Sequence, residues 1–317
     1  MSYKNNKIAF VFPGQGAQYI GMATDFFQNN EDYQLVLNQF KDKSGFDLSD
    51  IMSNGPEEQL KDTKFTQPAI LFHSIVAWLE LQKKLEIKPD YVAGHSLGEF
   101  SALVANGVLS FNDALYLVHK RGEFMIKAND GQDFAMSAVL GLSPEKVKEI
   151  CEKASETALV VAANFNTPIQ TVISGTKAGV DKATELAKEA KAKRVMPLVV
   201  GGPFHSPLIE KASQWLEDEM NHVVFNQTEI PVVSNINALP ETNPIKIKNN
   251  LVEQVTHSVQ WVDTINYLKE QNVNLFIEFG PQKVLNGMIT KINENAKVFN
   301  IDKITDIENV INQLESL

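Results

Sequence analysis

The pentapeptide at residues 94–98, Gly-His-Ser-Leu-Gly, lies between a strand-like segment and a helix-like segment. Residues 91–93 form a short apolar run, and residues 99–106 have good helical propensity. In this setting a G-x-S-x-G sequence predicts a nucleophile elbow, a sharp turn that presents the Ser96 hydroxyl at the positive end of a helix. Its two glycines would let the strand and the helix approach closely. A glycine turn with a surface serine is the alternative interpretation.

Composition limits the class of protein. The chain has 317 residues, of which 44% are hydrophobic and 21% charged, as in a globular protein with a large core. Its single cysteine, Cys151, excludes a disulfide framework or a cysteine zinc site within the chain and suits the cytoplasm. The net charge of −10 argues against nucleic-acid binding. No apolar stretch reaches the length of a membrane helix and no secretory signal is visible, so we expect a cytoplasmic protein without membrane contact.

The order of elements predicts two parts. Residues 1–130 and 201–317 alternate between strand-like and helix-like segments, including strands at 7–12 and 273–279, which indicates an α/β domain built on a parallel sheet. Residues 131–200 instead read β-α-β-β-α-β, the split βαβ or ferredoxin-like unit. Its expected strands are 134–140, 159–163, 171–174 and 195–200, and its expected helices begin at Ser143-Pro144 and cover 177–191. We therefore expect residues 131–200 to be an inserted subdomain in a discontinuous larger domain.

A serine nucleophile needs a base, and the chain has six histidines. His205 is the best candidate, because it follows the strand-like segment 195–200 and α/β proteins carry their chemistry at the carboxyl ends of strands. A plain loop histidine is the alternative. The other five fit other roles: a core residue (His73), a side chain turned away from the cleft (His95), a surface residue (His119) and residues without informative context (His222 and His257).

An oxyanion is stabilised by two converging backbone N–H groups. Leu97, directly after the serine, supplies one in an elbow. The glycine-rich turn at 12–16 could supply the other, or it could be an ordinary tight turn or the start of a phosphate loop. Tyr19 stands where a dinucleotide fingerprint needs its third glycine, and the lysine and Ser/Thr of a Walker loop are absent.

Arg121 lies on an apolar helix face. A capping box at residues 110–113 predicts a helix through about residue 127, on which Ala114, Val118, Arg121 and Met125 share one side. A guanidinium facing the core must be paired, because an isolated buried charge is costly. Its partner could be a structural carboxylate or the carboxylate of a substrate, held by the guanidinium fork.

With these residues in place, the chain resembles the malonyl-CoA:acyl carrier protein transacylases, the acyltransferases of fatty acid synthesis. The resemblance covers nearly the whole chain, and its motifs occur in the family's order. They are residues 12–18 with Gly21-Met22, 66–69, 94–99, 120–122, 166–170, 172–175, 202–206, 259–261 and 278–281. The family fold is an α/β-hydrolase-like large domain that carries a ferredoxin-like insertion, the arrangement that the element order predicts.

The resemblance also implies roles for individual residues. Ser96 would be the nucleophile, His205 its base, and Arg121 the clamp for the free malonyl carboxylate. A main-chain carbonyl at Gln254 would orient His205 in place of the acid of hydrolase triads. The remaining implied roles are the oxyanion-hole amides (Gln15 and Leu97), cleft-lining side chains (Asn166 and Gln67) and a ring that packs against the small C2 of malonate (Phe204).

The expected reaction is a ping-pong transfer of malonyl from malonyl-CoA to acyl carrier protein through a malonyl-serine. It needs no metal and no cofactor, and we expect a monomer. The carrier is acidic, and residues 177–194 hold a local excess of positive charge, which is a candidate contact or simply a solvated helix face. Three alternatives are a stand-alone acyltransferase of a polyketide synthase, a serine acyl hydrolase and a carrier-binding module without activity.

Overall fold

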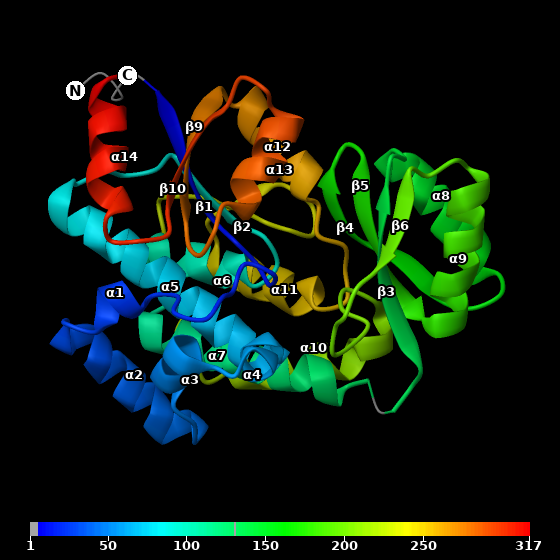
Figure 1. Cartoon of the computed structure of the whole chain (residues 1–317), viewed down its shortest axis with the longest axis horizontal. Coiled ribbons are helices and arrows are strands. Elements are labelled where there is room, and N and C mark those ends of the chain that lie inside the picture. The colour runs from blue at the N-terminus through cyan, green and yellow to red at the C-terminus, as the bar shows by residue number, and fades with distance from the viewer. Residues whose placement is uncertain (1–5, 130) are drawn as a thin grey trace.

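Two sheets, each with its own helices, lie side by side in the computed structural model, which describes residues 6–129 and 131–317 (Figure 1). The larger sheet has the order β10-β9-β1-β2-β7-β8, and all its pairs are parallel except the β7–β8 hairpin. Its strands are β1 (Lys7–Phe12), β2 (Tyr91–Gly94), β7 (Val232–Val233), β8 (Pro240–Glu241), β9 (Val273–Phe279) and β10 (Lys297–Ile301). The α/β class is confirmed, and β1 and β9 have the expected bounds.

Alternation along β1 explains the two cores of this part. Ile8, Phe10 and Phe12 point into a core shared with the helices on one face, whereas Ala9 and Val11 point into a core on the other face. Both faces of a parallel sheet are covered by helices, so its central strands read as continuous apolar runs.

The helices of this part follow from the same pattern. Those before the small sheet are α1 (Thr24–Phe27), α2 (Glu31–Ser44), α3 (Leu48–Asn54), α4 (Glu57–Lys61), α5 (Thr63–Lys84), α6 (Gly98–Ala105) and α7 (Phe111–Lys127). Those after it are the 3-10 turn η2 (Pro207–Ile209), α10 (Glu210–Met220), α11 (Pro244–Gln254), α12 (Trp261–Glu270), α13 (Val284–Ile292) and α14 (Asp306–Glu315). None of the described helices has both the length and the apolar composition that crossing a membrane requires. The predicted start of α7 is confirmed, since the Ser110 hydroxyl caps the helix by accepting from the Asp113 N–H at 3.1 Å.

The smaller sheet is antiparallel and has the order β4-β5-β3-β6, which is the strand order of a ferredoxin-like unit. Its elements are β3 (Phe134–Leu140), α8 (Pro144–Ser155), β4 (Val160–Thr167), β5 (Gln170–Thr176), α9 (Lys177–Glu189) and β6 (Arg194–Pro197). Helices α8 and α9 cover one face, and the other face turns Met136, Ala138 and Val172 towards the larger part. The predicted boundary at residue 130 lies outside the described residues.

One predicted strand differs in a way that matters for the site. The segment expected as a strand at 195–200 ends at Pro197, and it pairs with β3 in the small antiparallel sheet. His205 therefore does not follow a strand of the parallel sheet, and the rule used to select it was applied to the wrong strand. Its position depends instead on the loop that leads from the small sheet back to the larger part.

Candidate active site

The serine lies in a sharp turn between β2 and α6, with Ser96 at φ 53°, in the left-handed region. The close approach predicted for the two glycines is confirmed. A Cβ on Gly94 would lie 1.9 Å from the Gly98 backbone, and a Cβ on Gly98 would lie 2.1 Å from the Phe12 carbonyl oxygen. Only glycine fits these two positions, because the neighbouring atoms are backbone and cannot move aside.

Asn235 holds this turn, and the sequence reasoning missed it. The Ser96 N–H donates to Asn235 Oδ1 at 2.7 Å, and Asn235 Nδ2 donates to the Gly94 carbonyl at 2.6 Å. Asn235 is fully buried and comes shortly after β7, the strand next to β2. Its side-chain amide bridges both ends of the turn and gives hydrogen-bond partners to buried backbone groups that neither the helix nor the strand pairs.

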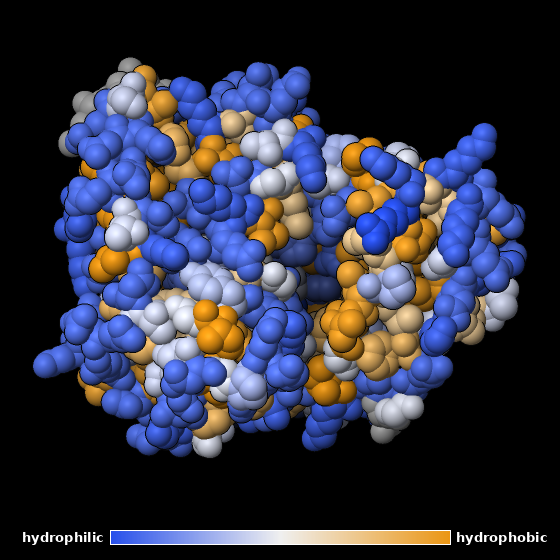
Figure 2. All heavy atoms as spheres, viewed as in Figure 1, coloured by the Kyte–Doolittle hydropathy of each residue, from blue (hydrophilic) through white to orange (hydrophobic). Residues whose placement is uncertain are grey.

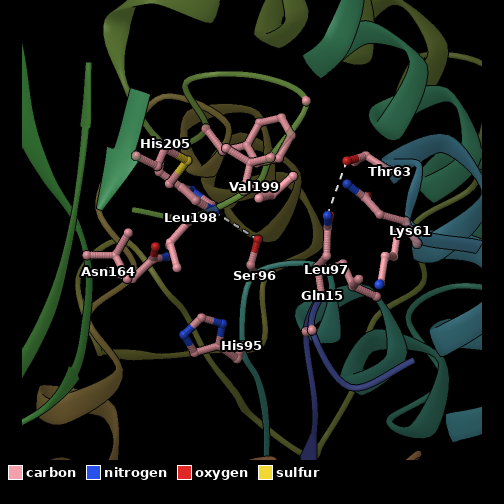
Figure 3. A pocket seen from close by; sticks show the side chains of 18 of the residues that line it. Gln15, Lys61, Thr63, His95, Ser96, Leu97, Asn164, Leu198, Val199 and His205 are labelled. Carbon is pink, nitrogen blue, oxygen red and sulfur yellow. Dashed lines mark hydrogen bonds between the residues drawn. The ribbon is translucent and has the colours of Figure 1, made fainter. Parts of the chain in front are cut away.

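His205 contacts the serine hydroxyl. Its Nε2 lies 2.8 Å from Ser96 Oγ, and Figure 3 marks this contact with a dashed line. Its Nδ1 faces two carbonyl oxygens, that of Gln254 at 2.9 Å and that of His257 at 3.1 Å. Because carbonyls only accept, Nδ1 carries the proton and Nε2 is left to accept from the serine. Burial, aided by the positive charge of Arg121, lowers the pKa of His205 to about 3, so the imidazole is neutral near pH 7.

Arg121 also reaches the serine. Its Nη2 donates to Ser96 Oγ at 3.0 Å and to Gln254 Oε1 at 2.9 Å, and its Nη1 donates to Gln67 Oε1 at 2.8 Å. These acceptors are neutral, and within the described residues Nε has no partner. Burial lowers the pKa of Arg121 to about 10, which still leaves it charged at neutral pH. A buried cation with unused N–H groups next to a nucleophile can bind an anionic part of a ligand.

The two amides expected to form an oxyanion hole flank the serine. Gln15 and Leu97 line the same cavity as Ser96 (Figure 3). In the described part of the chain, neither backbone N–H has a hydrogen-bond acceptor. The Gln15 side chain is tied down separately, since its Nε2 donates to Thr63 Oγ1 at 3.3 Å.

The cavity has a volume of about 1010 Å³ and is lined from both parts of the molecule. Figure 2 shows the surface hollowed between the larger and the smaller part. Gln67, Asn166 and Phe204 all line it, together with the reacting residues. Of the site residues named from the sequence, only Gln254 does not line this crevice; it lies behind it, with its carbonyl oxygen on His205 Nδ1.

Two histidine predictions were wrong. His95 does not turn away but lines the cavity, where its Nε2 lies 2.8 Å from Asn166 Oδ1. His119 is buried rather than at the surface, because Phe40 and Phe46 pack against its ring. The expected core position of His73 is confirmed, and its Nε2 lies 2.7 Å from the Asp302 carbonyl.

A nucleophile elbow in an α/β fold, with a histidine and an arginine in contact with its serine, defines a serine-dependent acyl-group enzyme. Within that class the chain belongs to the acyl transferase domain family, whose model matches residues 9–305.

Curated relatives agree with this assignment. A malonyl CoA-acyl carrier protein transacylase of Staphylococcus aureus (strain COL) is 42% identical over 304 residues, which cover 96% of this chain and 98% of the relative. The malonyl CoA-acyl carrier protein transacylase of Bacillus subtilis (strain 168) is 43% identical over 311 residues, 98% of each chain.

Solved structures share the fold. The malonyl CoA-acyl carrier protein transacylase of Coxiella burnetii superposes with a TM-score of 0.93 at 34% identity, covering 98% of both chains. A malonyl-transacylase solved in complex with a type II polyketide synthase acyl-carrier protein superposes with a TM-score of 0.91 at 35% identity, covering 98% of this chain and 100% of the other.

Proposed function

We propose that this chain transfers the malonyl group of malonyl-CoA to the phosphopantetheine thiol of an acyl carrier protein, for fatty acid synthesis. The contact of the Ser96 hydroxyl with both His205 and Arg121 is the single observation that carries the proposal. The names and coverage of the curated relatives support the same reaction. The protein would act in the cytoplasm. Residues 131–200 would form a subdomain inserted into the larger domain.

In the first half-reaction Arg121 holds the malonyl carboxylate while Ser96 Oγ attacks the thioester carbonyl. The serine proton passes to His205 Nε2, and Gln254 O stabilises the protonated ring at Nδ1. The Gln15 and Leu97 amides bind the developing oxyanion, each donor contributing about 3 kcal/mol. The carbon–sulfur bond then breaks, and the leaving thiolate takes the proton back from His205.

The second half-reaction reverses these roles. The carrier thiol gives its proton to His205 and its sulfur attacks the malonyl ester, and the Ser96 oxygen leaves and is reprotonated by the imidazole. His205 is oriented by two carbonyl oxygens instead of a carboxylate. A histidine without a carboxylate partner activates water poorly, so this arrangement favours a thiol acceptor over hydrolysis.

Two alternatives differ in the acceptor. A polyketide synthase acyltransferase would use the same site with another carrier, and one solved relative was captured with such a carrier. A serine acyl hydrolase would pass the malonyl group to water.

Mass spectrometry of the intact chain after mixing with malonyl-CoA tests the proposal. We expect a malonyl adduct on Ser96 that an acyl carrier protein discharges and water does not, and no adduct on Ser96→Ala. Release of free malonate at the rate of transfer would favour the hydrolase. An adduct discharged only by a polyketide carrier would favour the polyketide role.

A further inference from the structure

Glu99 is a buried carboxyl group that the mechanism above does not use. It lies on α6, three residues after Ser96, and is 1% exposed. One of its oxygens, Oε2, accepts from Gln254 Nε2 at 2.6 Å and from the Asn235 N–H at 3.2 Å. Within the described residues, no hydrogen bond ends on Oε1.

The Gln254 side chain joins this carboxyl group to Arg121. Its Oε1 accepts from Arg121 Nη2 at 2.9 Å, while its Nε2 donates to Glu99 Oε2 at 2.6 Å. The amide thus turns its oxygen to the cation and its nitrogen to the acid. It separates the two charges by one side chain and leaves Arg121 Nε free for a ligand.

The charges of Arg121 and Glu99 cancel each other only when no substrate carboxylate is bound. A buried guanidinium and a buried carboxylate together carry no net charge, which limits the cost of taking both out of water. A malonyl carboxylate on Arg121 would add a second anion to the same enclosed site. Two carboxylates near one cation favour protonation of the more deeply buried one.

The surroundings of Glu99 fit a proton exchange. Burial raises the pKa of Glu99 to about 7, against the opposing effect of Gln254, the Asn235 N–H, the Arg121 charge and the Ser234 hydroxyl. The imidazoles of His95 and His205 line the substrate cavity, and burial lowers the pKa of both below the usual value, so both are neutral at about pH 8. The buried Ser234 hydroxyl lies close enough to the carboxyl group to lower the pKa of Glu99, and it makes no hydrogen bond with any other described residue.

We propose that Glu99 is the buried counter-charge of Arg121, coupled to it through Gln254, and that its Oε1 takes up a proton when a substrate carboxylate binds the guanidinium. The proton comes from solvent and returns to it when the malonyl group leaves on the carrier thiol. The inference depends on the proposed malonyl transfer, which supplies the carboxylate.

Calorimetric titration with malonyl-CoA measures how many protons the protein takes up on binding. The Ser96→Ala chain is used because it binds malonyl-CoA without reacting. Titration at one pH in two buffers of different ionisation enthalpy gives the number of protons taken up. At about pH 8, above the pKa of resting Glu99, we expect uptake of at least about half a proton per malonyl-CoA. At about pH 5.5 Glu99 is already protonated, so uptake should be close to zero.

Two controls isolate Glu99. Acetyl-CoA carries the same CoA phosphates but no free carboxylate, and it should cause no uptake. Adding Glu99→Gln should abolish uptake with malonyl-CoA, because an amide oxygen at Oε2 keeps both hydrogen bonds but cannot take the proton. Adding Glu278→Gln should leave uptake unchanged, since Glu278 is equally buried and its pKa is also raised to about 7, but it caps α13 through the Leu285 and Asn286 N–H groups.

Binding of malonyl-CoA without uptake at about pH 8 would overturn the proposal, and so would uptake that survives Glu99→Gln. If the Glu99→Gln chain does not fold, the Ser96→Ala chain alone decides. Its Kd for malonyl-CoA must then weaken by up to about tenfold per pH unit above pH 7, and a Kd that is flat relative to acetyl-CoA overturns the idea. Failure of the proposed function looks different, because wild-type Ser96 would then form no malonyl adduct, or one that water or only a polyketide carrier discharges.

Discussion

The guanidinium of Arg121 and the hydroxyl of Ser96 are in direct contact, with Nη2 donating to Oγ at 3.0 Å. A carboxylate held by Arg121 would therefore lie only a few bonds from a carbonyl carbon attached to Ser96. Malonyl has this spacing, since a single methylene separates its carboxylate from its acyl carbon. In the proposed reaction, contact between Arg121 and Ser96 would therefore select a short diacid and position it for attack.

Arg121→Ala should separate two acyl donors. Loss of a charge-assisted pairing costs about 2–4 kcal/mol in the transition state, so kcat/KM for malonyl-CoA should fall about 30- to 1000-fold. Acetyl-CoA has no carboxylate to lose, and its transfer should survive or rise. The measurement is the ratio of kcat/KM for the two donors, with the neighbouring Lys120→Ala as the control. Equal losses for both donors would contradict the clamp.

Asn235→Ala should weaken both fold and rate. It leaves the buried Ser96 N–H and the Gly94 carbonyl without partners, which should lower the free energy of unfolding by about 2–4 kcal/mol. The transfer rate should fall with it, because Ser96 is no longer held at positive φ. Denaturant unfolding and kcat check this, against Asn237→Ala on the exposed part of the same loop. Wild-type kcat in a folded Asn235→Ala chain would contradict the positioning role.

Gly98→Ala should prevent a stable fold. The added Cβ would meet the Phe12 carbonyl oxygen at 2.1 Å, an overlap that costs about 3 kcal/mol or more because strand and helix would have to separate. Gly287→Ala is the matched control, since a Cβ there meets nothing within 4 Å and helix α13 should gain about 0.5–1 kcal/mol. Thermal unfolding of both variants measures the difference.

The activity of the protein should not show the loss at acidic pH that protonation of a histidine with an ordinary pKa would cause. The pKa of His205 is lowered below its usual value near 6.5, so the ring remains neutral and able to accept the serine proton as pH falls from 7 to 5. Hence kcat/KM for malonyl-CoA should not decline between about pH 7 and pH 5. A decline with a midpoint near 6.5 in a chain that is still folded would contradict a buried neutral base.

The basic residues at the start of β6, an edge strand of the small sheet, are a candidate contact for the carrier. Lys193 and Arg194 are exposed, whereas Lys177 and Lys182 of α9 already pair with Asp181 and Glu185. Charge reversal of Lys193 and Arg194 to Glu should raise KM for an acidic carrier several-fold and leave KM for malonyl-CoA unchanged. Reversal of Lys177 and Lys182 is the control, and equal effects of both pairs would exclude a local contact.

Short-range patterns predicted much of this fold. The G-x-S-x-G turn, the helix cap at Ser110 and the strand at 7–12 each depend on residues close in sequence, and each was confirmed. The β-α-β-β-α-β order also predicted the small sheet, because its connections are short. The strand predicted at 195–200 extends three residues past Pro197, the end of β6, because an apolar run that lines a cavity resembles one that lies in a sheet.

The supports of the site could not be predicted in the same way. Asn235 and Glu99 act through contacts with residues more than a hundred positions away in sequence, and an isolated asparagine or glutamate has no pattern that reveals this. The buried His119 was missed because α2, which covers that face of α7, lies far from it along the chain. Only Glu99 gave a signal in the sequence, because it is a charged residue in the otherwise apolar helix 98–105.

Ser96 and His205 share an uncommon backbone conformation, with φ of 53° and 56°. Side chains that branch at Cβ are strongly disfavoured there, whatever their chemistry. Threonine, a competent nucleophile in other enzymes, is thus ruled out at the elbow by main-chain geometry before its reactivity matters. Cysteine is not branched at Cβ, so this backbone conformation would accept it as the nucleophile in place of Ser96.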